Sequence, residues 1–448
     1  MNTNEKVFKD APVQQAVLKM AIPTVVSSLV LVIYNMADTF FVGQTHDAFQ
    51  VAAVSLTNPV FVMYMALANL FGIGGSALIS ILLGQNRKEE AKQVSSICGY
   101  GSLLSGFILG ILIIIFMDPL LKLLGSSVNT INFARDYLLY IALGAPFILF
   151  ANTFGHALRG EGAAKAAMVG GMIGTIANII LDPIFILTLD MKTAGAAIAT
   201  VLGNILGCIY YIYYFQYKSP MLSLKLKNCF VGKKLIGKLM KIGIPAGVNS
   251  ALMSIATILL NNALVKYGDA PVAAMGIVTK AYMLIVFIHM GLANGIQPLL
   301  GYCYGAKLKD RFKDIFQFSA ILTVIIGIVL TIVYVFFSQS IIQIFINDKD
   351  VIFYGKDMLV ATSLAGPILG ILFLSINSMQ AMERAMPATL LSVCRQGMIF
   401  IPLLYILDFI FGLSGINFTQ TVADYISIII SLFLLKNSFK VFNDSLDR

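Results

Sequence analysis

The stretch ILTVIIGIVLTIVYVFF, residues 321–337, decides the fold class of this chain. It holds no charged residue, and a second run, GFILGILIIIFM at residues 106–117, has the same character. Lipid hydrocarbon offers no partners to backbone N–H and C=O groups, so a chain that crosses it must form helices or a closed barrel. A barrel is built from short alternating segments, whereas these apolar runs are long and continuous, which favours helices.

The composition of the whole chain agrees with a membrane protein. Of its 448 residues, 58% are hydrophobic and only 12% are charged, and the mean hydropathy is +0.86. An ordinary soluble domain carries about 25% charged residues, so a soluble fold of this size could not cover its surface with the charges available here.

Twelve segments are apolar and long enough to cross a bilayer, which takes about 20 residues each. We therefore expect an all-α integral membrane protein with twelve transmembrane helices. The expected spans are residues 17–42, 51–83, 94–116, 132–158, 164–188, 193–217, 239–265, 271–303, 316–338, 355–382, 387–411 and 418–436.

Basic residues gather in alternate loops between these spans. The richest stretch, residues 218–241, lies in the middle of the chain, and the two termini fall on the same side as this stretch. Because loops rich in Lys and Arg stay in the cytoplasm, both termini and the middle loop are predicted to be cytoplasmic. The net charge of +9 is then explained by loops beside a lipid bilayer, and we expect no nucleic-acid partner.

The two halves of the chain repeat each other. Pro23 in Ala-Ile-Pro corresponds to Pro245 in Gly-Ile-Pro, and Gly84 corresponds to Gly305, at an offset of 221 or 222 residues. Six spans per half is an even number, so both halves start on the same side and form a parallel repeat related by a pseudo-two-fold axis. We expect an N lobe at 1–217, a basic cytoplasmic linker at 218–238 and a C lobe at 239–448. Such facing bundles suit alternating access.

Ionisable residues inside spans are the sharpest functional signal, because a charge at a helix centre costs about 2.5–3.5 kcal/mol on insertion scales. Asp38 in span 1 and Asp182 in span 5 both lie about one helical turn from the outer end. Asn178 is four residues before Asp182 on the same helix face, and Thr200 in span 6 lies at a comparable depth. Oxygens from three helices are therefore expected to converge in the outer part of the first half.

The repeat provides a control on these two acids. Asp38 falls opposite Leu259 or Leu260, and Asp182 falls opposite Leu403 or Leu404. A requirement of the scaffold would tend to appear in both halves, so the asymmetry favours a site. The alternative is that each Asp bonds a neighbouring backbone or hydroxyl group.

Two carboxylates close together in a low dielectric resist joint ionisation and titrate as a unit. They could therefore hold a proton or Na⁺ in one state and release it in another. Pro183, which follows Asp182, frees the carbonyl of Ile179, because proline lacks an N–H.

The remaining intramembrane groups carry weaker signals. Lys280 in span 8 and Arg395 in span 11 could pair with acids or line the cleft, and a lysine can also snorkel to the interface. Asp408 is close to the outer end of span 11 and is expected to be solvated. His289 is expected to be a packing residue with its hydrogen bonds satisfied.

Two glutamates occupy matching loop ends. Glu161 lies beside Arg159, and Glu383 lies beside Arg384, so ion pairs are expected at both positions on the cytoplasmic face.

Signatures of enzymes are absent from the sequence. It contains no GxSxG, no HExxH, no Walker A loop and no Cys/His metal cluster. We expect no enzyme activity, no catalytic residue and no cofactor. The only metal considered is Na⁺ at the cation site.

Five motifs resemble those of one transporter family: AIP at 21–23, NMADTFFVG at 35–43, LRGEG at 158–162, NIILDP at 178–183 and GAAIAT at 195–200. With the length and the repeat, they make the whole chain similar to the multidrug and toxic compound extrusion (MATE) family, in its MepA-like bacterial branch.

The resemblance implies a multi-pass, monomeric exporter of small amphipathic, often cationic drugs in the bacterial cytoplasmic (inner) membrane, coupled to H⁺ or Na⁺ entry. It implies that the cation site comprises Asp38, Asn178, Asp182 and Thr200. Carboxylates that another branch places in the C lobe are absent. The substrate-contacting residues are predicted to be Tyr34, Asn35, Met36, Asn152 and Asp182.

The sequence therefore predicts a cation-coupled multidrug efflux antiporter that works by alternating access. One alternative is a lipid-linked oligosaccharide flippase of the same superfamily, which would need a basic groove for a pyrophosphate. Intramembrane positive charges are few, namely Lys280 and Arg395, which disfavours it. The other alternative, a membrane-embedded enzyme, would need a nucleophile–base or metal constellation that the sequence does not contain.

Overall fold

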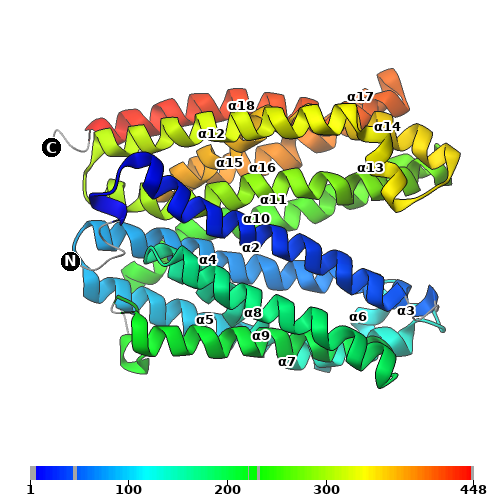
Figure 1. Ribbon diagram of the computed structural model, residues 1–448, viewed down its shortest axis with the longest axis horizontal. Coiled ribbons are helices and arrows are strands. Elements are labelled where there is room, and N and C mark those ends of the chain that lie inside the picture. The colour runs from blue at the N-terminus through cyan, green and yellow to red at the C-terminus, as the bar shows by residue number, and fades with distance from the viewer. Residues whose placement is uncertain (1–6, 44–47, 220, 230–232, 445–448) are drawn as a thin grey trace.

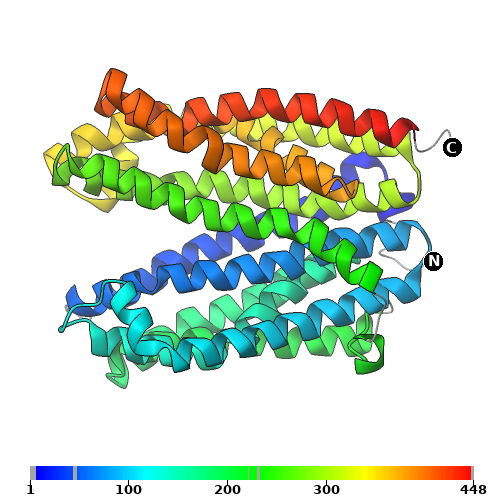
Figure 2. The same cartoon turned by 180° about the vertical axis from the view of Figure 1, so that it is seen from behind.

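The computed structural model describes residues 7–43, 48–219, 221–229 and 233–444, with the side chains of residues 35–40, 42, 43, 48 and 233 outside that description. In these ranges, eleven helices are long and apolar enough to cross a membrane, and a bent pair of helices supplies a twelfth span. The all-α fold with twelve spans is therefore confirmed. Helices α12, α15 and α18 group on one side of the molecule and α5, α7 and α9 on the other (Figures 1 and 2).

Helices α2 to α9, which we call the N lobe, supply the first six spans. Their bounds are α2 (Val13–Gly43), α3 (Ala48–Leu56), α4 (Asn58–Gly84), α5 (Lys88–Ile115), α6 (Met117–Leu123), α7 (Ile131–Gly160), α8 (Ala164–Pro183), the π-helix η1 (Ile184–Thr188) and α9 (Lys192–Lys218).

Helices α10 to α18, which we call the C lobe, supply the other six spans. Their bounds are α10 (Lys233–Val265), α11 (Asp269–Gly305), α12 (Lys309–Phe336), α13 (Ser338–Phe345), α14 (Lys349–Ser363), α15 (Gly366–Ala381), α16 (Ala385–Val393), the π-helix η3 (Cys394–Ile399), α17 (Phe400–Phe411) and α18 (Leu413–Asp444). Both termini lie at one end of the bundle, which we call the terminal end (Figure 1).

The span made by α14 and α15 is broken, with a bend of 48°. A break frees carbonyl groups, which inside a membrane must find other partners. Hydroxyl groups supply them here. Thr331 donates to the Ser363 carbonyl at 2.8 Å, and Thr421 donates to the Ala361 carbonyl at 2.6 Å.

Glycines bring the two lobes into backbone contact. The lobes meet where α4 packs on α10 and α11, and where α2 packs on α11. A Cβ on Gly305 would lie 2.1 Å from the Ile81 carbonyl oxygen, and one on Gly84 would lie 2.2 Å from the Tyr302 carbonyl oxygen. Small residues allow such close approach between membrane helices. The repeated glycines noted in the sequence therefore close the seam between the lobes at the terminal end.

The chain between the lobes is packed onto the N lobe. Ser95 and Ser96 of α5 donate to the Ser223 carbonyl at 2.9 and 2.5 Å, and the Ser223 N–H donates to the Ser95 hydroxyl at 2.8 Å. Tyr100 donates to the Leu224 carbonyl at 2.9 Å. This stretch ends in a short 3₁₀ helix, η2 (Leu226–Cys229). Part of the expected linker is thus fixed to α5 by hydrogen bonds.

The expected ion pairs of Glu161 and Glu383 are wrong in their partners. Glu161, in the turn after α7, is buried and accepts a hydrogen bond from Ser219 at 2.5 Å. Glu383 pairs with Lys238 of α10 at 2.9 Å. Both glutamates lie in the turn after a helix, and among the described residues neither carboxylate pairs with its neighbouring arginine.

A Gly305→Ala substitution should hold α4 and α11 apart at the terminal end, because the added methyl group has no room beside Ile81. Spin labels at Asn86 and Lys307, in a background without cysteine, would report this as a shift of population to longer distances. Gly276→Ala is the control, since a Cβ there meets nothing within 4 Å. Equal distances in the two variants would contradict a seam that depends on glycine.

Glu161 should make the stability of the protein depend on pH. Burial raises the pKa of Glu161 from 4.5 to about 7, so the folded state binds more protons than the unfolded state between these values. Stability should therefore fall as pH rises from 5 to 7 and level off above pH 7. Thermal unfolding in detergent should show this decline in the wild type and in Glu89→Gln, which alters an exposed acid, but not in Glu161→Gln. A decline of the same size in Glu161→Gln would contradict the assignment.

Candidate functional site

Three helices of the N lobe bring polar side chains together inside the bundle. The Asn178 amide of α8 donates to the Thr200 hydroxyl of α9 at 3.3 Å, and the Tyr34 hydroxyl of α2 lies 3.2 Å from the same Thr200 oxygen. Asn178 and Thr200 are both buried. Residues 166 positions apart in the chain thus share one hydrogen-bonded cluster.

Asp182 lies one helical turn beyond Asn178 on α8, and 0% of its surface is exposed. The α-helix ends at Pro183, and the chain continues as the π-helix η1. A π-helical turn leaves backbone groups out of the regular pattern and is frequent at functional sites. The proline that follows Asp182 therefore accompanies a change of helix type directly beside the buried acid.

The predicted site residues are brought together only in part. Tyr34, Asn178 and Thr200 form the cluster, with Asp182 one turn away. The side chains of Asn35, Met36 and Asp38 lie outside the described residues. Asn152 of α7 is half-buried and donates to the Ile148 carbonyl of its own helix at 2.8 Å, and no hydrogen bond joins it to the cluster in the part of the chain that is described.

Oxygen atoms dominate this cluster. Besides the Thr200 hydroxyl, it holds the Asn178 Oδ1, a buried oxygen with no hydrogen-bond partner among the described residues, and Asp182 lies one helical turn further along α8. Buried polar atoms are normally satisfied. An oxygen left over beside an acid is what a proton-bearing group or a small hard cation would use.

The C lobe contains a buried ion pair instead. Arg395 on the π-helix η3 donates to Asp424 of α18 at 2.8 Å, and the two side chains are 2% and 0% exposed. Gln420 also donates to this carboxylate at 2.9 Å, and the Arg395 guanidinium lies 5.1 Å from the centre of the Phe373 ring. The charge of the acid is therefore met within the lobe.

Asp424 was missed by the sequence reasoning, although it lies inside the span expected at 418–436. Counting every acid within the spans would have found it. Of the two roles left open for Arg395, pairing with an acid and lining the cleft, the structure shows the ion pair. Lys280 is exposed, and His289 is buried, with neither ring nitrogen in a regular hydrogen bond to a described residue.

Asp408 is not solvated as expected. It is buried, forms an ion pair with Lys266, and accepts a hydrogen bond from Tyr267 at 2.6 Å. Lys266 and Tyr267 follow α10 directly, so the turn between α10 and α11 folds over the end of α17 and covers this carboxylate.

Loss of one partner from the C-lobe pair should be costly. Asp424→Asn leaves the Arg395 charge buried without its counter-ion, which in other proteins costs about 3–5 kcal/mol. We expect a marked drop of the thermal unfolding midpoint in detergent, with recovery in the double variant Arg395→Met, Asp424→Leu. Asp408→Asn is the control and should cost less, since its partner Lys266 is about half exposed. An Asp424→Asn protein as stable as the wild type would contradict this account.

A duplicated bundle of twelve spans, with a polar cluster buried in one lobe, is the architecture of a secondary transporter. The family model described as MatE matches residues 23–184 and again residues 245–406, so the repeat inferred from the sequence appears as two copies of one family unit. The chain belongs to the MATE family.

Curated relatives cover nearly the whole chain. The protein named "Multidrug export protein MepA" from Staphylococcus aureus (strain MSSA476) is 32% identical over 418 residues, which is 93% of this chain and 92% of the relative. Its namesake from Staphylococcus haemolyticus (strain JCSC1435) is 31% identical over 429 residues, 96% of this chain and 94% of the relative.

Solved structures share the fold. One, described as a crystal structure of MATE in the straight conformation, has a TM-score of 0.94 at 22% identity and covers 99% of this chain and 100% of its own. Another, described as the outward-facing conformation of a multidrug resistance MATE family transporter, has a TM-score of 0.92 at 23% identity and covers 99% of each chain.

Proposed function

We propose that this protein is a cation-coupled multidrug efflux antiporter that works by alternating access. Multidrug export is the activity named for its relatives, which align over more than nine-tenths of the chain. The observation that carries the coupling is the fully buried acid Asp182 beside the Asn178–Thr200 cluster. A buried carboxylate in a membrane is a functional candidate by default.

The coupling ion, H⁺ or Na⁺, binds at Asp38, Asn178, Asp182 and Thr200. An ion entering from outside neutralises the two acids, and this lowers the cost of keeping them in a low dielectric. The neutral form favours a different packing of α2, which carries Pro23 inside the helix, and the drug leaves to the outer medium. Once the ion departs to the cytoplasm, the acids regain charge and attract the next cationic drug.

Substrate contacts are proposed at Tyr34, Asn35, Met36, Asn152 and Asp182. Tyr34 is half-buried and reaches Thr200, so one residue of this set already touches the cation cluster. Drug and ion would therefore compete for neighbouring positions, which is what exchange of one for the other requires.

The proposed setting is the bacterial cytoplasmic membrane. The basic residues of the loops at the terminal end favour a cytoplasmic position for both termini, and the proposed unit is a monomer with lipid around it. The lobe boundaries proposed are 1–217 and 239–448, with 218–238 between them.

The two alternatives gain no support. A flippase for lipid-linked sugars would need free positive charge in its groove, and Arg395 is already paired with Asp424. For a membrane-embedded enzyme, no group of three or more His, Cys, Asp or Glu residues suited to a metal occurs in the described ranges. The family to which the chain belongs consists of transporters.

Replacing the buried acid should uncouple transport. In proteoliposomes with pH and Na⁺ gradients imposed separately, we expect Asp182→Asn to lose at least about tenfold of gradient-driven ethidium transport, because the amide cannot change its charge when the ion leaves. The gradient that drives the wild type identifies the coupling ion.

Asp190→Asn is the matched control, since Asp190 is an exposed acid on the loop that follows η1. It should transport as the wild type does. Gradient-driven transport by Asp182→Asn at the wild-type rate would rule out the coupling role. Substrate turnover without movement across the bilayer would instead point to an enzyme.

A further inference from the structure

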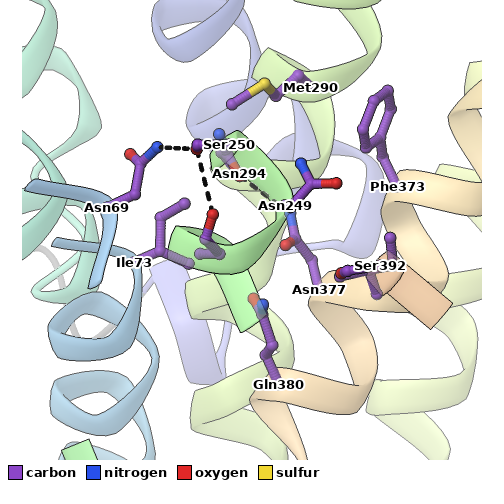
Figure 3. Close-up of a pocket in the computed structure, with 12 residues that line it drawn as sticks. Asn69, Ile73, Asn249, Ser250, Met290, Asn294, Phe373, Asn377, Gln380 and Ser392 are labelled. Atoms are coloured by element: carbon purple, nitrogen blue, oxygen red, sulfur yellow. Dashed lines mark hydrogen bonds between the residues drawn. The ribbon is translucent and has the colours of Figure 1, made fainter. Parts of the chain in front are cut away.

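A small polar chamber lies between the lobes, where α4 faces helices of the C lobe (Figure 3). Its volume is about 40 Å³, and its polar lining includes Asn69, Asn249, Ser250, Asn294, Asn377 and Gln380. Among the described residues no ionisable side chain lines it, and Phe373, Met290 and Ile376 supply apolar surface. We call it the carboxamide chamber.

Amide pairs brace the C-lobe side of the carboxamide chamber. The Asn377 amide of α15 donates to Asn294 Oδ1 of α11 at 3.0 Å, and one turn further Gln297 of α11 donates to Gln380 of α15 at 2.7 Å. Two parallel bonds between the same two helices fix the side-chain orientations. This is the preorganisation that a binding site needs.

One acceptor in the chamber is left over. The Asn249 Oδ1 is a buried atom without a hydrogen-bond partner among the described residues, while its amide nitrogen lies 4.0 Å from Met253 Sδ one turn along α10. A buried unsatisfied carbonyl oxygen is costly unless a partner arrives. The carboxamide chamber thus presents an acceptor to a donor that is not part of the protein.

The wall opposite belongs to the other lobe. Asn69 of α4 donates to the Ser250 hydroxyl of α10 at 3.3 Å, and Ile73 of α4 also lines the space. A rocking movement that parts α4 from α10 would remove this wall and widen the chamber. Gln380 and Ser392 at its inner end are buried, whereas Asn249 and Asn294 are half-buried.

The N lobe has no counterpart of the amide pairs. The offset of 221 that relates Gly84 to Gly305 carries Asn294, Gln297 and Asn377 onto Ile73, Ser76 and His156, none of which bears a carboxamide. The amides are therefore not a need of the shared scaffold.

We propose that the carboxamide chamber is a second, uncharged subsite on the substrate path, which takes the N–H or O–H donors of an amphipathic cation. This inference rests on the proposed efflux function and deepens it. The N-lobe acids attract the positive charge of the drug, and Asn249 with its neighbours accepts hydrogen bonds from the uncharged N–H or O–H groups of the drug. Substrate preference then has two independent components, charge and donor content.

The size of the chamber sets what enters it in each state. Measured as the space open to the centre of a water molecule, one water needs about 10–15 Å³, so about 40 Å³ has room for a few waters. With the seam closed, it holds water or the donor-bearing edge of a molecule whose bulk lies outside. With α4 displaced, Phe373 and Met290 become available to an aromatic body, for which methionine is an adaptable contact.

Two cationic probes of equal charge distinguish the contribution of charge to binding from that of hydrogen-bond donors. Ethidium carries two aryl amine donors, and tetraphenylphosphonium carries none. We expect Asn249→Leu to weaken ethidium binding by about two- to tenfold, the worth of one hydrogen bond, and to leave tetraphenylphosphonium binding within twofold. Asn249 Oδ1 has no hydrogen-bond partner among the described residues, so replacing the amide leaves none of them unpaired at that atom.

Two further variants guard against a folding defect. Asn417→Leu alters a buried amide of α18 whose Oδ1 also lacks a described partner but which lies outside the chamber, and it should change neither affinity. The double variant Asn294→Leu, Asn377→Leu removes both members of one amide pair and should repeat the loss for ethidium alone.

The subsite is overturned if Asn249→Leu weakens both probes equally or neither. Its failure is distinct from failure of the coupling proposal, which is read from Asp182→Asn. A protein in which Asp182→Asn transports normally while Asn249→Leu still discriminates between the probes retains the subsite and loses the coupling role. The reverse pattern retains the coupling and removes the subsite.

Discussion

A charged side chain inside a bilayer must be paired with an opposite charge or be neutralised by a proton or ion, because the hydrocarbon offers neither water nor counter-ions. The two lobes meet this constraint differently. In the C lobe, Arg395 and Asp424 neutralise each other in a buried ion pair. In the N lobe, Asp182 is equally buried, and its neighbours Asn178 and Thr200 are neutral. The two lobes therefore bury their acids in different surroundings, one against an arginine and the other beside neutral polar groups.

Twelve spans and a parallel repeat could be predicted because both are visible in the sequence itself, the spans as apolar runs of sufficient length and the repeat as short motifs at a nearly constant offset. The N-lobe cluster followed from depth, since Asn178, Asp182 and Thr200 lie at similar distances from helix ends. Partners between distant helices could not be predicted in this way. Asp408 meets Lys266 through a folded turn, and Glu161 meets Ser219 at the start of the linker, contacts that no spacing along the chain encodes.

Duplication has left the same kind of irregularity in both lobes. The fifth span of each contains a π-helical segment, η1 after Asp182 and η3 around Arg395. In each case a buried ionisable residue lies at or directly before the altered turn. The positions are not equivalent in the repeat, so the irregular helix of each lobe accompanies a different buried charge. The carboxamide pairs between α11 and α15 are a second difference between the lobes.

The attachment of the interlobe chain to α5 decides how the molecule can be divided. Ser223 and Leu224 complete the hydrogen bonds of Ser95, Ser96 and Tyr100, so the stretch up to Cys229 behaves as part of the first bundle. If the protein were expressed as two fragments divided after Cys229, the first fragment would keep the interlobe chain that covers α5. A cut before Ser219 would strip it and leave a polar face on α5 open to the surroundings.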